Sequence, residues 1–268
     1  MAMNSCDICS KSKSVVLWRV KAYDILRCAN CGLIYANVVE SDIIQAYEKD
    51  YYKTIYQDYE SDKNIHDKNN TRLLENNEKY FSSGRMIEIG SAFGFFLEAA
   101  KNRNWKATGY EISAYASMIA RDTYHQDIKT ADFLKDVIPE KVDLIAMLDT
   151  IEHLLAPSRY IEKISQSLKP GGGLVITTGN ISSFVAQVFG VRWRMIYPPF
   201  HVYYYSPQTI TLLLEKYGLE VLTISQESKY QNLNSILKYL FGVNKKDVLA
   251  IPIKADIGDI MQVIARKR

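Results

Sequence analysis

The sequence is poor in the features that mark several classes of protein. It has only 4 cysteines in 268 residues, which excludes a disulfide-dense mini-protein, and no apolar run approaches the ~18 residues that a membrane span requires. The formal net charge is +3, with −1 on residues 1–81 and +4 on the remainder, so no strongly basic domain points to a nucleic-acid binder. With 47% hydrophobic residues, the chain has ample material for a folded core.

Two nucleotide-binding motifs are also missing. No G-x-x-x-x-G-K-[ST] occurs, which excludes a P-loop. Counted from Gly90, the positions of the second and third glycines of a nicotinamide fingerprint hold Ala92 and Phe95, which counts against a dehydrogenase. The first residues show no positively charged lead before an apolar stretch, so we expect a cytoplasmic protein with no membrane partner.

All four cysteines lie within the first 31 residues, as Cys6-x2-Cys9 and Cys28-x2-Cys31. The spacing lets a tight turn aim both thiolates of a pair at one ion, and two pairs complete a tetrahedral zinc site with no open position. Two alternatives are four unrelated buried thiols and a redox pair, although no strand–helix unit typical of a thioredoxin adjoins either pair. The spacing therefore predicts structural Zn²⁺ bound by these cysteines.

The residues around the cysteines predict a small separate unit. Residues 15–20 and 23–27 have the composition of two short strands, the arms of a zinc ribbon over residues 1–40. Zinc would supply the folding energy that so small a unit lacks. Four thiolates around Zn²⁺ carry a net negative charge, which nearly cancels the five basic and two acidic residues of positions 1–31. The ribbon is thus a poor phosphate clamp.

A helical connector is expected next, over residues 41–83. Ser41 suits the N-cap, and the pattern predicts helix to about Phe81. Five tyrosines crowd its first half, and they either pack the helix on the larger domain or form a wall or lid over a ligand: Tyr47, Tyr51, Tyr52, Tyr56 and Tyr59.

Strand and helix patterns alternate over residues 84–268, which predicts an α/β domain with a parallel sheet covered on both faces. Helices are expected between the first five strands. One of them begins at Pro157, runs to Leu168 with apolar residues at helical spacing, and is ended by a Lys-Pro-Gly-Gly-Gly turn. The strands are expected at residues 86–89, 107–110, 127–130, 142–148, 174–178, 221–225 and 260–265.

The ends of four strands carry residues suited to a nucleoside ligand. The first strand ends in Glu88-Ile89-Gly90-Ser91-Ala92-Phe93-Gly94, a glycine turn that lets a ligand approach the backbone. Glu111 ends the second, 21 positions after the first turn glycine, where an acid can accept both hydroxyl hydrogens of a ribose. Asp132 and Phe133 follow the third and suit an adenine, and Asp149 ends the fourth.

These residues together resemble the class I S-adenosylmethionine-dependent methyltransferase family over most of residues 84–268. The turn before the fifth strand, Leu168-Lys169-Pro170-Gly171-Gly172, also fits, and Glu152-His153-Leu154 with Pro157 is similar to the ubiquinone-biosynthesis-like branch. The resemblance implies a Rossmann-like, doubly wound, mostly parallel seven-stranded sheet with an antiparallel last strand. Ala92 departs from the family's middle glycine, and we expect it to be tolerated with a negative φ.

The resemblance also implies the cofactor site. Glu88 would orient the turn, the turn would pass the methionine part of S-adenosylmethionine, and Glu111 would hold the ribose. Asp132 and Phe133 would frame the adenine, with Asp149 and Thr150 near the sulfonium. The full set of implied cofactor-binding residues is Glu88, Gly90, Ser91, Ala92, Phe93, Gly94, Glu111, Ile112, Asp132, Phe133, Asp149 and Thr150.

An oxygen acceptor also requires a base. His153 follows the fourth strand and His201 lies in a loop after the fifth, so these are the candidate catalytic residues, with packing or capping as the alternative roles. The aromatic-rich residues 193–205 either form a wall of the acceptor site or pack as a surface hairpin on the core. Arg192 and Arg194 suit a phosphate or carboxylate.

The implied function is transfer of a methyl group from S-adenosylmethionine to a small-molecule acceptor, an oxygen of a sugar or secondary metabolite. The ribbon adds a looser resemblance to certain bacterial methyltransferases that act on such compounds. One alternative is an RNA methyltransferase, which the near-neutral ribbon and the absence of an Asn/Asp-Pro-Pro-aromatic motif after the fourth strand disfavour. Another is a non-catalytic cofactor-binding protein. The sequence leaves the acceptor, the methylated atom and the oligomeric state open.

Overall fold

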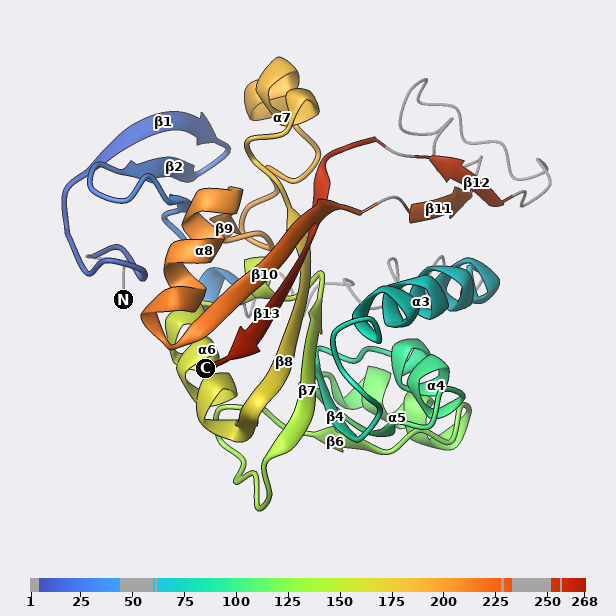
Figure 1. Ribbon diagram of the computed structural model, residues 1–268. Helices are drawn as coiled ribbons and strands as arrows, with labels where there is room; N and C mark the ends of the chain where they lie inside the picture. The colour runs from blue at the N-terminus through green and yellow to red at the C-terminus, as the bar shows by residue number, and fades with distance from the viewer. Residues whose placement is uncertain (1–4, 44–59, 61, 228, 233–251, 256) are drawn as a thin grey trace.

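A seven-stranded sheet forms the centre of the protein (Figure 1). The computed structural model describes residues 5–43, 60, 62–227, 229–232, 252–255 and 257–268. In spatial order the strands are β10 (Leu219–Gln226), β13 (Ile260–Lys267), β8 (Leu168–Gly179), β7 (Val142–Leu148), β4 (Arg85–Ile89), β5 (Lys106–Glu111) and β6 (Ile128–Thr130).

The pairing confirms the predicted fold class. Strands β8, β7, β4, β5 and β6 are parallel to one another, whereas β13 lies antiparallel between β8 and β10. Six of these strands occur where the sequence predicts them, with ends that differ by at most two residues. The expectation for the other is wrong at its start, because β8 begins at Leu168 and includes residues 169–173, which were expected to form a turn; its pairing with β7 is irregular between Val142 and Leu144. The carboxyl ends of the parallel strands meet at one edge, where such sheets bind ligands.

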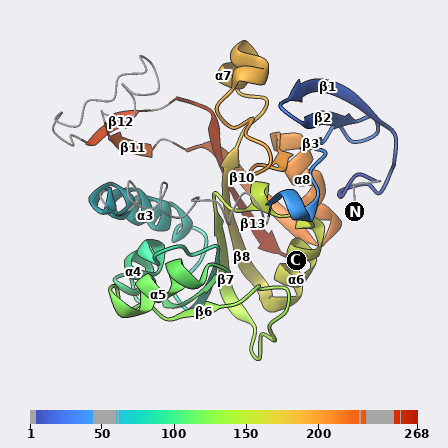
Figure 2. The ribbon, with the colours of Figure 1, turned by 180° about the vertical axis from the view of Figure 1, so that it is seen from behind.

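Helices cover both faces of this sheet (Figures 1 and 2). Side chains of β7 alternate between two apolar clusters, with Ile145 and Met147 in one and Leu144 and Ala146 in the other. One face carries α3 (Lys63–Asn77), α4 (Phe95–Lys101) and α5 (Ala114–Asp122), and the other carries α6 (Pro157–Ser167) and α8 (Pro207–Lys216).

Local sequence signals fix several helix starts. The Ser113 hydroxyl accepts the Ala116 N–H at the start of α5, and Ser206 with Thr209 forms a capping box at the start of α8. Pro157 occupies the first turn of α6, as predicted. The remaining helical turns are α7 (Phe184–Phe189) and the 3₁₀ turns η1 (Ile151–His153) and η2 (Gly190–Arg192).

Two expectations about helices are wrong. No helix separates β6 from β7 within residues 131–141, because Asp132 accepts the Leu134 N–H and turns the chain at once, leaving too few residues for a helix. The helical backbone after the ribbon begins at Glu40 rather than after Ser41. There the Asp42 carboxylate accepts the Val39 N–H, so the cap falls earlier. The five tyrosines of residues 47–59 lie outside the described residues.

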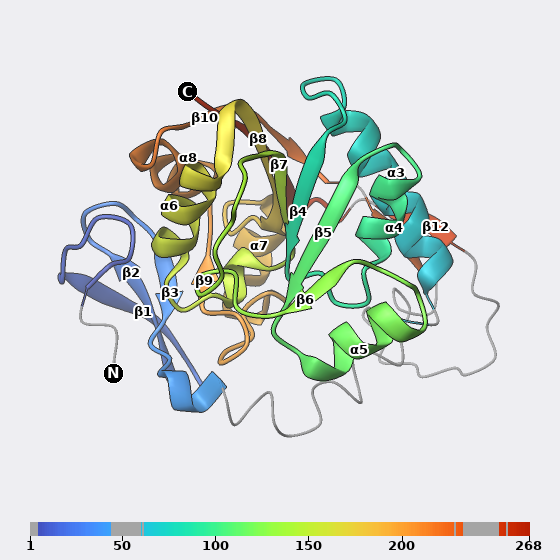
Figure 3. The ribbon, with the colours of Figure 1, turned by 90° about the horizontal axis from the view of Figure 1, so that it is seen from below.

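The N-terminal strands belong to a second sheet. The predicted arms are β1 (Ser14–Val20) and β2 (Tyr23–Cys28), and the sheet continues through β3 (Ile34–Ala36) to β9 (Tyr203–Tyr204). Since β9 comes from the large domain, the ribbon sheet is completed by a distant part of the chain. Figure 3 shows β3 beside β9, with α6 and α8 close by.

A two-stranded arm lies near α3 (Figure 1). Its strands, β11 (Lys229–Asn232) and β12 (Pro252–Ala255), pair antiparallel. The side chain of Asn69 on α3 donates to the backbone oxygen of Tyr230 and accepts its N–H, at 3.0 and 2.7 Å. Within the described part of the chain, no helix combines the length and apolar character that crossing a membrane demands.

Replacement of Asp259 by alanine is expected to lower the free energy of unfolding by about 3 kcal/mol. Its carboxylate is 1% exposed and accepts from Trp193 Nε1 at 2.9 Å and from the Arg194 guanidinium at 2.8 Å, so the variant strands a buried indole N–H. Denaturant unfolding measures the loss. In the control, Asp24→Ala, the partner Arg19 is exposed and the unfolding midpoint should not move.

Candidate active site

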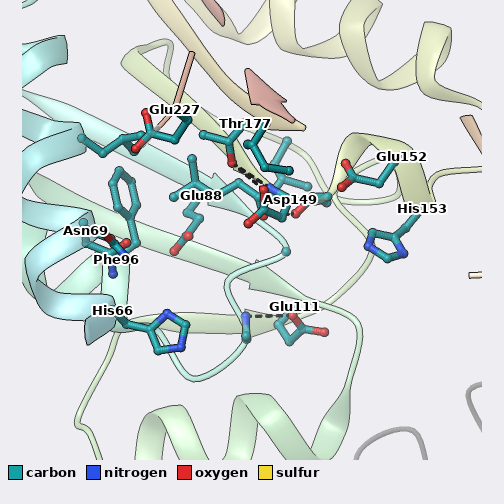
Figure 4. A pocket seen from close by; sticks show the side chains of 18 of the residues that line it. His66, Asn69, Glu88, Phe96, Glu111, Asp149, Glu152, His153, Thr177 and Glu227 are labelled. Carbon is teal, nitrogen blue, oxygen red and sulfur yellow. Dashed lines mark hydrogen bonds between the residues drawn. The ribbon is translucent and has the colours of Figure 1, made fainter. Parts of the chain in front are cut away.

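A cavity of about 1130 Å³ opens at the carboxyl ends of β4, β5 and β7. Its volume exceeds that of a typical pocket for one small ligand, so it has room for two reactants. Figure 4 shows acids from three strand ends and η1 around it. The sequence-predicted residues that line it are Glu88, Gly90, Ala92, Glu111, Ile112, Phe133, Asp149, Thr150, His153 and His201.

The glycine turn after β4 reverses the chain through left-handed backbone. Gly90 has φ 78° and Gly94 has φ 77°. Ala92 has φ 46°, so the expectation of a negative φ there is wrong. A non-glycine residue in this region costs roughly 1–2 kcal/mol. A hydrogen bond offsets this cost: the Ala92 N–H donates to Glu111 Oε2 at 2.9 Å (Figure 4).

Glu111 at the end of β5 is held from two sides. Besides Ala92, the Ser113 N–H donates to its Oε1 at 2.8 Å. Burial raises the pKa of this carboxyl, and these backbone donors oppose the rise. Each carboxylate oxygen accepts more than one hydrogen bond, so the acid can still receive a ligand's hydroxyls. Glu111 therefore fixes the turn and lines the cavity at once.

Glu88, at the end of β4, is buried with no hydrogen-bond partner for Oε2 among the described residues. Burial, and then the charge of Glu111, raise the pKa of Glu88 well above its ordinary value. An unpartnered buried oxygen is costly, which makes this atom suited to a polar group of a ligand.

Four residues predicted to bind the cofactor do not line the cavity. The Ser91 hydroxyl donates to the backbone oxygen of Glu88, Phe93 packs against Phe95, and Gly94 begins α4. Asp132 Oδ1 accepts from Tyr160 Oη at 2.7 Å as well as from the backbone after it. These residues lie behind the residues that line the cavity and support them.

Asp149 joins the cavity to the two-stranded arm. It has φ 48°, its N–H donates to the backbone oxygen and to Oγ1 of Thr177 at 2.9 and 3.0 Å, and its Oδ1 accepts from the Thr177 hydroxyl at 2.9 Å. Lys229 Nζ lies 2.5 Å from Oδ2. Burial would raise the pKa of Asp149, but the Lys229 ammonium, the Thr177 hydroxyl and the charge of Arg194 together outweigh it, and the pKa is lowered. Sequence reasoning missed Lys229, since 80 positions separate the pair.

The two candidate histidines meet in the cavity. Their rings lie edge to face with centroids 4.7 Å apart. His153 Nδ1 is 2.9 Å from the backbone oxygen of Phe200, and His201 Nδ1 is 2.8 Å from that of Met195. Because a carbonyl oxygen only accepts, each Nδ1 carries the proton and Nε2 is the basic nitrogen. Burial lowers the pKa of both rings, so both are neutral at neutral pH.

Glu152 completes this cluster. Its Oε2 accepts from Thr178 Oγ1 at 2.9 Å, while Oε1 has no hydrogen-bond partner in the described part of the protein. One ligand atom from each of Glu152, His153 and His201 lies within 4.8 Å of the others, so the cluster can bind a cation or move a proton. Burial raises the pKa of Glu152, with the His201 ring opposing this.

The aromatic segment 193–205 divides between the two expected roles. Met195, Arg194 and His201 line the cavity, whereas Trp193, Tyr203 and Tyr205 are buried in the core. The segment therefore packs its rings into the core beside the cavity and does not lie on the surface as a hairpin. Arg194 already pairs with Asp259, which sequence could not show because 65 positions separate them.

The four cysteines converge as predicted. Sγ of Cys6 lies 3.5 Å from that of Cys31, and Cys9 and Cys28 are separated equally. All four sulfurs lie within 4.8 Å of one another. Zn–S bonds of about 2.3 Å place tetrahedral ligands about 3.8 Å apart, so number and spacing fit zinc.

Comparison with known proteins identifies the family. A family model described as a methyltransferase domain matches residues 61–224. A ubiquinone biosynthesis O-methyltransferase of Saccharophagus degradans is 24% identical over 200 residues, which cover 69% of this chain and 83% of that protein. Another, of Pseudomonas entomophila, is 25% identical over 142 residues, 49% of this chain, and the match spans only 61% of that relative's length.

Solved structures share the fold. An Archaeoglobus fulgidus S-adenosylmethionine-dependent methyltransferase superposes with a TM-score of 0.57 at 17% identity, covering 81% of this chain and 100% of that one. A Thermotoga maritima S-adenosylmethionine-dependent methyltransferase, a possible histamine N-methyltransferase, gives 0.56 at 19%, covering 81% and 98%. Since the family model matches more than half of the chain, the protein belongs to the methyltransferase domain family.

Proposed function

We propose that the chain methylates a hydroxyl oxygen of a small-molecule acceptor, with His201 taking the hydroxyl proton. The observation that carries the proposal is a neutral imidazole in the cavity whose Nδ1 is tied to the Met195 carbonyl, which makes Nε2 the basic nitrogen. His153 packs edge-on against this ring and lowers its pKa further, keeping it unprotonated.

For the cofactor, we propose an orientation set by strand order. Glu111 accepts the ribose hydroxyls, and the turn at Gly90 and Ala92 passes the methionine part. The unpartnered Glu88 oxygen receives the amino group. Ile112 and Phe133 line the adenine end, and Asp149 with Thr150 lies near the sulfonium. The cavity size, the acid at Glu111 and the orphaned Glu88 oxygen support this fit.

When bound, S-adenosylmethionine would supply a methyl carbon activated by its positively charged sulfur, with the sulfur as the leaving group that keeps the electron pair. The chain aligns the acceptor and receives the proton at His201 Nε2. The Glu152 carboxyl, beside His201, stabilises the imidazolium that results.

For the acceptor, we propose a phenolic or similarly planar metabolite rather than a sugar. Ile43, Leu154 and Met195 give the cavity an apolar surface, and a flat apolar ring carrying a hydroxyl suits it better than a fully hydroxylated ring. The curated relatives that match are named for ubiquinone biosynthesis, which supports the same choice.

We further propose that Cys6, Cys9, Cys28 and Cys31 bind Zn²⁺, with residues 1–40 as the ribbon, residues 41–83 as the connector and residues 84–268 as the catalytic domain. The support is the convergence of the four sulfurs.

The function is tested by incubating the protein with methyl-labelled S-adenosylmethionine and a fractionated cell extract. Label is expected in the small-metabolite fraction, in a product with a base-stable methyl ether, and a purified catechol should also be labelled. Label in RNA would support the competing RNA methyltransferase, and label in no fraction would contradict an active enzyme.

Replacement of Glu111 by glutamine is expected to weaken binding of S-adenosylmethionine by about 1–3 kcal/mol. Glutamine keeps one acceptor oxygen and replaces the other by an NH₂ group, which cannot accept a hydrogen bond. Titration calorimetry measures the change. The matched control is Asp132→Asn, which lies behind the wall and keeps the oxygen that accepts from Tyr160. If Asp132→Asn weakens binding while Glu111→Gln does not, the assignment of Glu111 is wrong.

The pH dependence of kcat should report His201. A base must be neutral, and burial lowers the pKa of His201 from 6.5, so kcat should be level near neutral pH and fall only below that lowered pKa. His201→Asn should reduce kcat about 100-fold or more and abolish this acid limb. The control is His125→Asn, at a turn with φ 53°, which asparagine tolerates. An unchanged acid limb in His201→Asn would exclude it as the base.

A further inference from the structure

We infer that the four-cysteine ribbon is a positioning device for the acceptor end of the active site: through strand β3 it holds the segment that carries His201. The inference rests on the proposed function, because it concerns the proposed base. It assigns the ribbon a role inside the catalytic domain, not that of a separate binding module.

The first link is the backbone of residues 202–204. Strand β3 pairs antiparallel with β9, matching Ile34 with Tyr204 and Tyr35 with Tyr203, and the Ala36 N–H donates to the Val202 oxygen at 2.8 Å. The Val202 N–H donates to the backbone oxygen of Glu152 at 2.8 Å. The chain immediately after His201 is therefore hydrogen-bonded both to the ribbon and to η1.

The second link joins β3 to the cysteines. The Cys28 N–H donates to the Leu33 oxygen at 2.8 Å and the Gly32 N–H to the Cys28 oxygen at 3.1 Å, so the second cysteine turn closes directly into β3. Gly32 has φ 79°, which suits this turn to glycine. A metal that fixes Cys28 and Cys31 thereby fixes where β3 begins.

The third link anchors the first cysteine turn to the helices on the sheet. The Asp7 carboxylate accepts from the N–H and the hydroxyl of Ser158 at the start of α6, both at 2.8 Å. Lys216 Nζ on α8 donates to the Ile8 oxygen at 2.7 Å. Cys6, Cys28, Leu33 and Tyr35 are buried in the apolar cluster that also contains residues of α6 and α8.

These contacts join both cysteine turns of the ribbon to the rest of the protein. With Zn²⁺ bound by four thiolates the ribbon is also near neutral in charge, because that negative centre nearly cancels the excess of five basic over two acidic residues in positions 1–31. By contrast, the described part of the ribbon makes no hydrogen bond to Glu88, Gly90 or Glu111 at the proposed cofactor end. Loss of the ribbon should therefore disturb proton removal before it disturbs cofactor binding.

The experiment compares the full-length protein with and without Zn²⁺, with metal content measured by elemental analysis. After chelation, kcat for labelled methyl transfer to catechol is expected to fall about 100-fold, as for a displaced catalytic group. The dissociation constant for S-adenosylhomocysteine should change less than about threefold. Hydrogen exchange should accelerate together in residues 33–36 and 202–204.

A second variant breaks the link while leaving the cysteines intact. Ala36→Pro removes the N–H that donates to Val202 and should lower kcat and alter its acid limb, with KM and zinc content close to wild type. The control is Val16→Thr, at an exposed position of β1, which should leave kcat and KM unchanged.

Three outcomes overturn the inference, and a fourth separates it from the proposed function. Unchanged kcat after zinc removal would show that the ribbon does not position the site. A rise in KM alone would make it a substrate-binding module, and joint loss of cofactor binding and kcat would make it a general part of the fold. The fourth is that hydrogen exchange accelerates together in residues 33–36 and 202–204 after zinc removal while His201→Asn leaves kcat unchanged. In that case the coupling of the ribbon to residues 202–204 stands, and only the assignment of His201 as the base is wrong.

Discussion

The hydrogen bond from the Ala92 N–H to Glu111 ties together the ends of two neighbouring parallel strands. It holds a non-glycine residue in left-handed backbone and at the same time aims the carboxylate along the cavity wall. Through its other oxygen, Glu111 accepts from Ser113, whose hydroxyl begins α5. The Glu111 side chain thus connects the glycine turn to the start of α5, and the geometry at this end of the cavity depends on it.

The two ends of the cavity are built differently. The end proposed to bind the cofactor comes from successive strand ends, so its residues follow from the order of the sheet. The end proposed to bind the acceptor collects residues from η1, the segment before β9 and the arm that carries Lys229.

Period-two and helical patterns were enough to predict all seven sheet strands, because each buried strand needs a run of apolar residues whatever surrounds it. A regular alternation of strands and helices predicts a helix between β6 and β7. The structure has a turn there instead, in which Asp132 accepts the Leu134 N–H. The sequence also predicts a negative φ at Ala92, because propensity argues against left-handed alanine and the compensating Glu111 bond is not local.

The sequence by itself determined the sheet, the glycine turn, the acid at Glu111 and the clustering of four thiols, because each depends on spacing within one or two adjacent elements. Only the tertiary structure decided that Lys229 meets Asp149, that Asp259 holds Arg194, and that the ribbon sheet is finished by β9. These contacts join residues far apart in the chain, and their energy appears only once packing has brought the partners together.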